Sequence, residues 1–364
     1  MHPVDVAMKQ AVDSGVFPAA ELLVCRGGAI VHHRHYGQSR EGTLYDIASL
    51  TKVISTTTLA MQWIAEGRLK LTDRMADHLP ELPHDTHGAI TIEQILQHCA
   101  GYPRWQPYYQ EVPIRAIGTP EGRRIILESA LREPLVYPPG TNCIYSDIGY
   151  ILLGELLERI GGNGLEHLFV ERIAEPLDLL NTGYCPLPSS ERMIPRPADY
   201  AIDRRYAPTE DCPWRRKVLH GEVHDQNCYA MGGVAGHAGL FSTAEDLHAF
   251  VHQFAACDRG HSEWIPSAVV RRFLRFSDRL PAADATWVLG WDTPAHPNSQ
   301  AGRHFSRHSV GHLGYTGCSL WIDLENDCWV ILLTNRIHPS TTNEKIRAFR
   351  PALHDLIYEE LLSG

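Results

Sequence analysis

The chain has 364 residues, of which 44% are hydrophobic, so it can form one large domain or two moderate ones with a sizeable core. Its 43 acidic and 33 basic residues give a formal net charge of −10, and we therefore expect neither a nucleic-acid nor a membrane partner. Nine scattered cysteines without a Cys-x-x-Cys pair are typical of free thiols in a reducing compartment. No continuous apolar stretch resembles a signal peptide or a membrane span, so a cytoplasmic protein is predicted.

The first half of the chain predicts a hairpin followed by helices. Strand-like runs at 20–25 and 29–36 flank the turn residues Arg26, Gly27 and Gly28, so the sheet is expected to begin at the N-terminus. A helix is predicted from Ser49 to Glu66, ending at Gly67. The clearest further helices are expected at 92–99, 121–131, 147–160 and 165–174. The stretch from 185 to 216 lacks periodicity and predicts a long excursion.

Strand patterns return near the C-terminus, at 288–291, 319–323 and 328–334. Before them, Ser242 and Glu245 have the spacing of a capping box that opens a helix to about residue 254. An apolar-periodic helix is predicted at 351–362. Strands at both ends indicate a discontinuous α/β domain, residues 1–70 and 205–364, that encloses a mainly helical insertion, residues 71–204.

The segment Ser49-Leu50-Thr51-Lys52 lies at a predicted helix start. A serine hydroxyl is a poor nucleophile unless a neighbouring group takes its proton. Three residues along a helix return to the same face, so Lys52 is expected to place its amine beside the Ser49 oxygen. Burial would lower the pKa of such a lysine and make it a candidate base. The alternative is that Ser49 caps the helix while Lys52 is a solvated side chain.

Two later segments carry further candidate chemistry. Tyr145-Ser146-Asp147 precedes a predicted helix, so the Tyr145 phenol could relay protons, although Asp147 as a helix cap over a packed Tyr145 is the alternative. In 311–317 the glycines let backbone amides approach a ligand, as an oxyanion hole requires, although a glycine-rich strand entrance without a ligand is the alternative.

The order of these motifs resembles that of the serine β-lactamase and penicillin-binding-protein superfamily. The sequence around and between the motifs is similar to that of its class C β-lactamase-like subgroup. The motif positions are Ser49/Lys52, Tyr145/Asp147 and His312/Gly314. Further segments similar to the subgroup lie at 47–52, 95–101, 137–141 and 232–242. The resemblance implies an α+β fold: an antiparallel sheet flanked by terminal helices, an inserted all-helical domain, and a site in the crevice between them.

The resemblance also implies a role for each matching position. Ser49 would be the acylated nucleophile, and Lys52 and Tyr145 its proton-transfer partners. His312 would face them from the sheet edge. The backbone amides of Ser49 and Tyr315 would form the oxyanion hole beside Gly314.

Three departures from the family pattern bear on the substrate. Asp147 stands where the family usually has Asn, and an ionised Asp cannot donate to a substrate amide. Leu313 replaces a Thr whose hydroxyl contacts a substrate carboxylate, and His312 replaces Lys. These changes weaken the recognition of penicillin-like carboxylates.

Other clusters have simpler explanations. His220, Glu222 and His224 do not form a His-Glu-x-x-His motif, and with His237 they are expected to hydrogen-bond near the cleft rather than bind a metal. His33 and His35 share one face of a predicted strand and are taken as ordinary sheet residues. Trp105 and its aromatic neighbours Tyr102, Tyr108 and Tyr109 could wall a substrate pocket or pack against one another. We expect no metal and no cofactor.

The leading hypothesis is a cytoplasmic serine hydrolase, most simply carboxylesterase-like, that cleaves a small ester, amide or peptide-like substrate through a Ser49 acyl-enzyme. One alternative is a DD-peptidase, muropeptide amidase or β-lactamase that uses the same residues. Another is an inactive homologue that binds a ligand or partner. The oligomeric state is left open.

Overall fold

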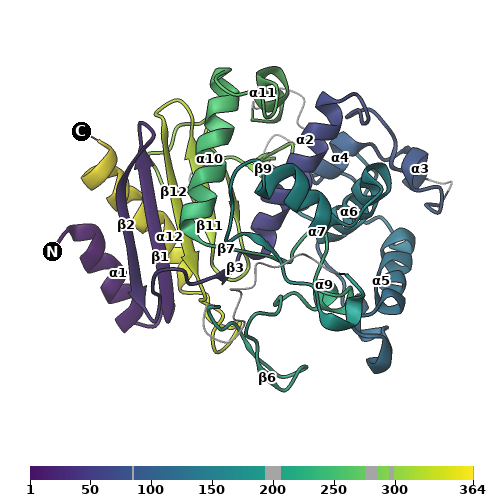
Figure 1. Cartoon of the computed structure of the whole chain (residues 1–364), viewed down its shortest axis with the longest axis horizontal. Coiled ribbons are helices and arrows are strands. Elements are labelled where there is room, and N and C mark those ends of the chain that lie inside the picture. The colour runs from purple at the N-terminus through teal and green to yellow at the C-terminus, as the bar shows by residue number, and fades with distance from the viewer. Residues whose placement is uncertain (84–85, 193–205, 275–284, 295–298, 364) are drawn as a thin grey trace.

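The computed structural model describes residues 1–83, 86–192, 206–274, 285–294 and 299–363. Its centre is an antiparallel sheet with the strand order β2-β1-β12-β11-β10-β9-β8. The strands are β1 (Ala19–Arg26), β2 (Ala29–Gly37), β8 (Trp287–Val288), β9 (Trp291–Asp292), β10 (Val310–Leu313), β11 (Ser319–Asp323) and β12 (Cys328–Thr334). Residues from both ends of the chain therefore share one sheet (Figure 1).

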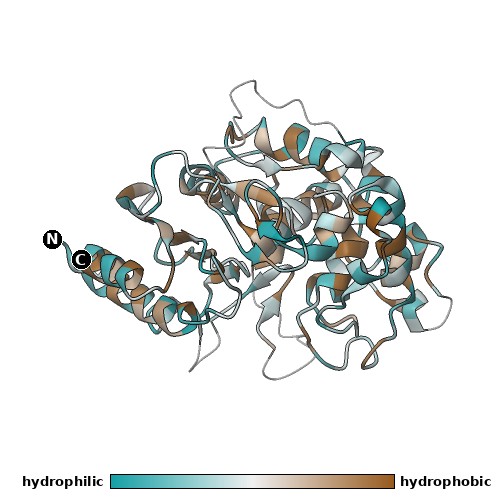
Figure 2. Cartoon of the chain, turned by 90° about the horizontal axis from the view of Figure 1, so that it is seen from below, coloured by the Kyte–Doolittle hydropathy of each residue, from teal (hydrophilic) through white to brown (hydrophobic). Residues whose placement is uncertain are grey.

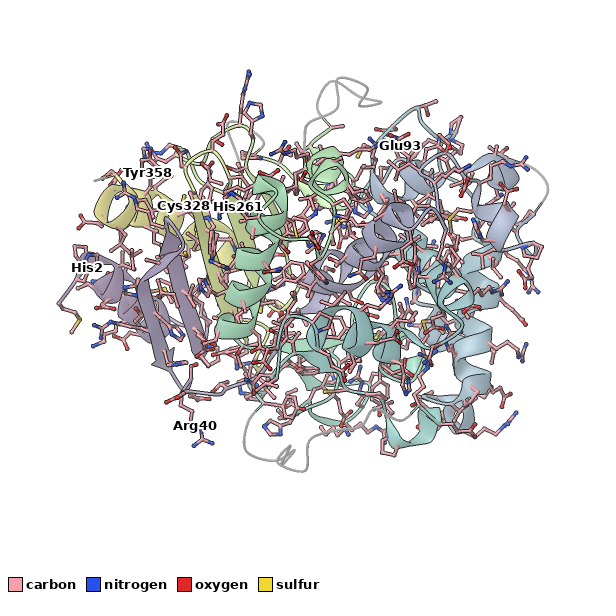
Figure 3. All side chains as sticks on the ribbon, turned by 45° about the horizontal axis from the view of Figure 1, so that its top comes forward. His2, Arg40, Glu93, His261, Cys328 and Tyr358 are labelled. Carbon is pink, nitrogen blue, oxygen red and sulfur yellow. The ribbon has the colours of Figure 1, made fainter. Side chains whose placement is uncertain are left out.

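Helices cover both faces of this sheet. The terminal helices α1 (Pro3–Asp13) and α12 (Ile346–Ile357) pack together on one face, and both chain ends lie at that side of the molecule (Figures 1 and 2). His2 and Tyr358 mark this end in Figure 3. On the other face lies α10 (Ala244–Arg259), next to α11 (Ser267–Leu274). One apolar core cluster lies on each face of the sheet, and successive residues of β1 pack alternately into the two clusters. Both faces of β1 are therefore buried, which explains why its sequence is apolar from Ala19 to Cys25 except for Glu21.

The remaining helices gather beside the sheet (Figure 1). They are α2 (Thr58–Ala65), α3 (Met75–His78), α4 (Ile92–Leu96), α5 (Pro120–Arg132), α6 (Asp147–Gly161), α7 (Leu165–Phe169) and α9 (Gln226–Ala230). Short 3₁₀ turns occur at Ala48–Leu50, Thr86–Ala89, Tyr108–Gln110, Ile114–Ala116 and Pro188–Ser190, and π-helical segments at Lys52–Thr57, Val170–Ala174 and Tyr358–Leu362. Two small sheets complete the structure: β3 (Tyr45–Asp46), β7 (Leu240–Ser242) and β4 (Gly183–Tyr184), and β5 (Asp211–Cys212) with β6 (Lys217–Val218).

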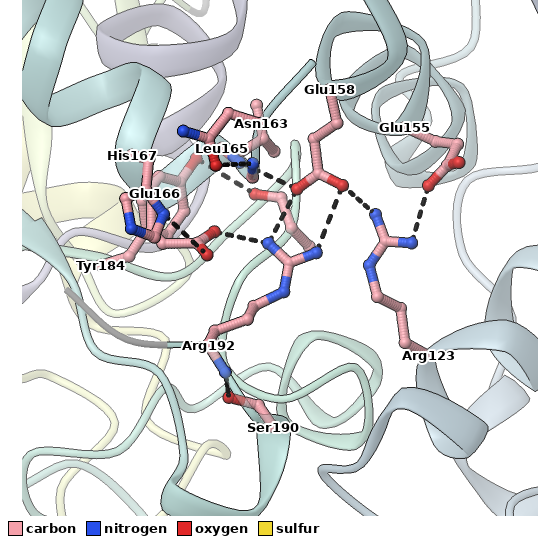
Figure 4. Close-up of polar contacts among 12 residues, drawn as sticks. Arg123, Glu155, Glu158, Asn163, Leu165, Glu166, His167, Tyr184, Ser190 and Arg192 are labelled. Carbon is pink, nitrogen blue, oxygen red and sulfur yellow. Dashed lines mark hydrogen bonds and ion pairs between the residues drawn. The ribbon is translucent and has the colours of Figure 1, made fainter. Parts of the chain in front are cut away.

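A charged network connects the helical elements (Figure 4). Arg123 of α5 pairs with Glu155 and Glu158 of α6, and Arg192 pairs with Glu158 and with Glu166 of α7. Because two arginines share three carboxylates, each charge keeps a partner although the side chains are largely buried. The network fixes α6, whose N-terminus carries Asp147. Among the described residues, no helix is both long and apolar enough to cross a bilayer.

The antiparallel sheet and flanking terminal helices confirm the predicted fold class, but several element predictions were wrong. The hairpin predicted at 20–36 is confirmed as β1–β2, whereas the pattern assigned no element to the residues of α1, whose start signals are Pro3 at the first helical position and the His2 cap. The strand predicted at 288–291 is instead the hairpin β8–β9, because Gly290 turns the chain with a φ of 86°. The C-terminal helix begins at Ile346, not at 351, and contains Pro351.

The predicted capping box is displaced by one residue. Thr243, not Ser242, caps α10, and its side chain accepts a hydrogen bond from the backbone N–H of Asp246. Ser242 is the last residue of β7 and contacts Thr182. Glu245 is therefore free of the capping role that the sequence pattern predicted. Of the predicted excursion at 185–216, residues 193–205 lie outside the described residues, and the proposed domain boundaries stay a prediction.

The loop after α9 packs against α6 backbone to backbone. A Cβ atom on Gly236 would lie 2.2 Å from the Tyr150 carbonyl oxygen and 2.9 Å from the Gly154 Cα atom. Only glycine fits at this approach, and it brings the following residue, His237, to the buried end of Lys52.

We predict that Gly236→Ala lowers the free energy of unfolding by about 3 kcal/mol, because the backbones of α6 and the loop must separate. Gly183→Ala is the matched control, since a Cβ there meets nothing within 4 Å. Urea denaturation of both variants checks this, and equal midpoints would contradict the packing argument.

Candidate active site

The Lys52 side chain is fully buried and makes three hydrogen bonds. Its Nζ atom donates to Ser49 Oγ at 3.0 Å, to Asp147 Oδ1 at 2.6 Å and to the His237 carbonyl oxygen at 3.1 Å. An ammonium has three protons and no acceptor, so each proton of the charged form finds a partner. A buried cation without such partners would cost several kcal/mol. The arrangement therefore holds a charged lysine against the Ser49 hydroxyl.

Ser49 is presented by an irregular start of the helix that was predicted from 49 to 66. It lies on a 3₁₀ turn, the chain then passes through a π-helical segment, and α2 begins only at Thr58. Ala48 has a φ of 47°, a conformation that residues other than glycine rarely adopt. The Asp46 carboxylate secures it by accepting the Ala48 N–H at 2.9 Å and the His224 N–H at 2.7 Å. Ser49 stays partly exposed, so a substrate can reach it.

Tyr145 is held in place at the entrance of α6. Ser146 caps this helix, and its backbone N–H donates to His98 Nδ1 at 3.1 Å. The Tyr145 ring packs 4.5 Å from the His98 ring and 5.1 Å from the Trp287 ring, centroid to centroid. Lys52 Nζ lies 4.9 Å from the Tyr145 ring centroid, and the Tyr145 hydroxyl shares a hydrogen bond with Ser49. The structure thus brings together three residues that lie in two sequence motifs.

The charge state of Tyr145 follows from its surroundings. Burial and the negative charge of Asp147 raise the pKa of Tyr145 well above its ordinary value. Tyr145 is therefore a neutral phenol at rest. Since Lys52 is already a donor to Ser49, neither group is a free base before the substrate arrives.

His312 lies on strand β10, where the sequence pattern indicated a glycine-rich segment before the strand at 319–323. Its ring is 5.9 Å from that of Tyr145 and 5.3 Å from that of Trp287, centroid to centroid. Burial and the positive charge of Lys52 lower the pKa of His312 to about 3, so this imidazole is neutral. Its Nδ1 atom lies 2.9 Å from the Leu313 carbonyl, and its buried Nε2 atom has no hydrogen-bond partner among the described residues. Leu313 itself packs toward α1 and α12, on the other side of the sheet.

The loop after β10 lies against the turn that carries Ser49. A Cβ on Gly314 would lie 2.6 Å from the Ile47 carbonyl oxygen, so only glycine permits this approach. Arg336 donates from its Nε atom, at 3.0 Å, and from a terminal nitrogen, at 2.7 Å, to the Tyr315 carbonyl, which fixes that peptide. Within the described part of the chain, the Tyr315 backbone N–H has no backbone acceptor. Its use in an oxyanion hole with the Ser49 amide is a proposal consistent with this geometry.

The histidine segment at 220–237 makes hydrogen bonds near the site. His237 Nε2 lies 2.9 Å from Asp225 Oδ1, and His224 Nε2 lies 3.2 Å from Glu210 Oε2. Although burial alone would raise it, the pKa of Asp225 lies below its ordinary value because His237 faces the carboxylate. The His224 ring stacks on that of Tyr315, with centroids 5.5 Å apart.

Trp105 lies in the aromatic loop that follows residue 101 and is exposed. Its ring is 6.4 Å from that of Tyr109, which in turn packs edge-on against Trp214. A substrate-contacting role for Trp105 stays a prediction. His98 and Trp287 pack around Tyr145, and the Arg104 guanidinium carbon lies 5.6 Å from the Tyr145 ring centroid. Trp287 and Arg104 lie in no motif of the sequence. His98 lies inside the predicted helix at 92–99 and inside the family-like segment 95–101, but neither pattern gives it a role.

Similarity to known proteins identifies the family of this chain. A family model described as Beta-lactamase matches residues 4–353, almost the whole chain. The chain belongs to the Beta-lactamase family. This family includes serine hydrolases, so the serine hydrolase class expected from the motif order is confirmed.

The proteins to which this chain is similar differ in their described activities. A protein of Escherichia coli K12 named putative D-alanyl-D-alanine carboxypeptidase is 30% identical over 93% of this chain and 82% of its own length. The structure of EstCE1, a hydrolase with promiscuous acyltransferase activity, has a TM-score of 0.69 at 20% identity over 96% of this chain and 97% of that chain. The octameric penicillin-binding protein homologue from Pyrococcus abyssi has a TM-score of 0.72 at 17% identity over 99% of this chain and 77% of that one. The two structures support the fold.

We predict that Lys52→Ala and Tyr145→Phe each lower the rate of ester hydrolysis by about 10² or more, the usual effect of losing a proton-transfer partner. Tyr150→Phe is the matched control, because the Tyr150 hydroxyl contacts Thr57 rather than Ser49. Steady-state turnover of a p-nitrophenyl ester by folded variants tests this, and near-wild-type rates for Lys52→Ala or Tyr145→Phe would contradict these assignments.

Proposed function

We propose that this family member cleaves an ester or amide bond through an acyl-enzyme on Ser49, with carboxylesterase-like hydrolysis of small esters as its leading activity. The observation that carries the proposal is the contact of the partly exposed Ser49 hydroxyl with both the Lys52 ammonium and the Tyr145 phenol. A protein that only binds a ligand does not need this set, which argues against an inactive homologue.

The protonation states favour a concerted relay. As Ser49 Oγ forms a bond to the substrate carbonyl carbon, its proton passes to the Tyr145 oxygen, and the Tyr145 proton passes to the leaving group as the ester or amide bond breaks. No free phenolate accumulates, which suits the high pKa of Tyr145. Lys52 keeps its proton and stabilises the developing charge on the Ser49 oxygen. Water then reverses the relay to release the acid.

We expect a short p-nitrophenyl ester to produce a covalent adduct on Ser49 whose mass equals that of the acyl group. Intact-mass spectrometry after rapid quenching, followed by peptide mapping, tests this. Ser49→Ala should abolish both the adduct and turnover. An adduct on another residue, or turnover retained in Ser49→Ala, would contradict the assignment of Ser49 as the nucleophile.

A DD-carboxypeptidase activity is the second candidate. It is favoured by the Escherichia coli relative named putative D-alanyl-D-alanine carboxypeptidase, and by an exposed cation beside the site. Arg104 lies near the Tyr145 ring, and no acidic side chain within the described residues pairs with it. A guanidinium binds carboxylates in a bidentate manner. Arg104 could therefore replace the contact that Leu313 does not offer.

If this candidate holds, a peptide ending in D-Ala-D-Ala is hydrolysed, and Arg104→Gln raises its KM by about tenfold through the loss of a charge-assisted contact. A neutral ester serves as the control substrate and keeps its KM. Absence of peptide hydrolysis at saturating substrate would contradict the DD-carboxypeptidase candidate and leave ester hydrolysis as the proposed activity.

The compartment also remains a proposal. None of the nine cysteines forms a disulfide in the structure, and eight of them are buried. This agrees with a reducing environment such as the cytoplasm.

A further inference from the structure

A cluster of acidic and histidine side chains lies outside the candidate active site, on the face of the sheet that α10 covers. It contains Glu21 on β1, Glu245 in the first turn of α10, and His33 and His35 on the edge strand β2. Each side chain offers one ligand atom, and these four atoms all lie within 4.8 Å of one another. None of these residues takes part in the catalytic geometry.

The strand register explains why the cluster forms. Glu21 is the direct partner of His35 in the β1–β2 pairing, and His33 is the partner of Leu23. Because side chains two residues apart share one face of a strand, His33 and His35 both lie on the face of Glu21. Glu245, in the first turn of α10, completes the group. Because Thr243 rather than the predicted box of Ser242 and Glu245 caps the helix, the Glu245 side chain is not used as a cap.

We propose that a zinc ion binds at this Glu–His cluster, that is, to Glu21, His33, His35 and Glu245. Two imidazoles and two carboxylates form a ligand set that suits Zn²⁺. Zinc–ligand bonds of about 2.0–2.1 Å place tetrahedral ligand atoms about 3.3 Å apart. The present spacing therefore closes to that geometry through side-chain shifts of about 1 Å.

Two features of the cluster are unfavourable without a cation. Glu21 is fully buried although it is a carboxylic acid, and the Glu245 carboxyl group lies within hydrogen-bonding reach of it. Two adjacent carboxylates repel unless a proton or a cation lies between them. The buried Oε2 atom of Glu245 has no hydrogen-bond partner among the described residues. A divalent cation would compensate both charges.

His35 is oriented as metal-binding histidines usually are. His35 Nδ1 lies 3.3 Å from Ser39 Oγ, which accepts a hydrogen bond from the Tyr45 hydroxyl. Such a contact through one ring nitrogen orients the imidazole and leaves the other nitrogen for the metal. His33 Nε2 lies 2.9 Å from Glu21 Oε1, so zinc would displace the proton that this pair shares. The side chains of His33 and Glu245 are 23% and 42% exposed, which gives an ion access from solvent.

Zinc at this position would connect three elements. Among the described strands, β2 is an edge strand whose sole neighbour is β1, and the ion would join β2, β1 and the first turn of α10. We therefore expect zinc to stabilise the sheet edge while hydrolysis at Ser49 proceeds without it.

The test is zinc binding by the full chain after metal removal with a chelator. Titration calorimetry is expected to show one Zn²⁺ per chain, and Glu21→Gln, His35→Ala and Glu245→Gln each to weaken binding by at least about tenfold. His308→Ala is the control, since this exposed histidine lies outside the cluster. Ser49→Ala should bind zinc like the wild type, which separates this site from the proposed function.

X-ray absorption of the zinc-loaded protein provides a readout that does not depend on the stability of the variants. The expected spectrum has nitrogen and oxygen ligands only. Sulfur ligands would mean binding by the free cysteines, and binding that is absent or insensitive to all three cluster substitutions would overturn the proposal.

Discussion

The buried ammonium of Lys52 is the constraint on which the candidate site depends. A fully buried cation is tolerated only when all its protons are satisfied, and the three acceptors come from three separate parts of the chain: Ser49, Asp147 and the His237 carbonyl. The fold must therefore bring together the turn that carries Ser49, the start of α6 and the loop after α9. The glycine contact between that loop and α6 and the charged network around α6 both serve this placement.

Asp147 changes the chemistry expected from the resemblance. An amide at this position would leave the lysine without a counter-ion, whereas the Asp147 carboxylate accepts a hydrogen bond from Lys52 Nζ at 2.6 Å. Burial and this same carboxylate also raise the pKa of Tyr145. In the proposed mechanism, proton transfer is then a relay through Tyr145 rather than an abstraction by a neutral lysine. The neutral His312 adds no charge to this balance, where the family usually has a lysine.

Much of the site could be predicted from the sequence because its residues lie in ordered motifs. Ser49 and Lys52 are three residues apart at a helix start, and the order of Tyr145 and His312 identified the family. The partners that position them were not predictable in this way. His98 lies in the family-like segment 95–101, but no pattern gives it a role, and Trp287 reaches Tyr145 from a hairpin whose sequence has no motif. The pattern at 288–291 predicts a single strand because it does not identify Gly290 as a turn.

The metal cluster shows a second limit of sequence patterns. His33 and His35 were correctly placed on one face of a strand, but nothing in the spacing indicated that Glu21 is buried opposite them. Glu245 was assigned to a capping box, and the one-residue shift of the α10 cap is a local choice between Ser242 and Thr243 that tertiary contacts decide. Pairing register and helix capping therefore have to be known before such a cluster becomes visible.

The charge of Lys52 is the most direct test of this account. The chain has only five lysines, so nitrogen-15 labelling of lysine gives a simple NMR spectrum of the Nζ groups. At neutral pH we predict an ammonium signal for Lys52, with protons that exchange slowly because the group is buried, and its loss in Lys52→Arg. The chemical shift of a neutral amine for Lys52 at neutral pH would contradict the account.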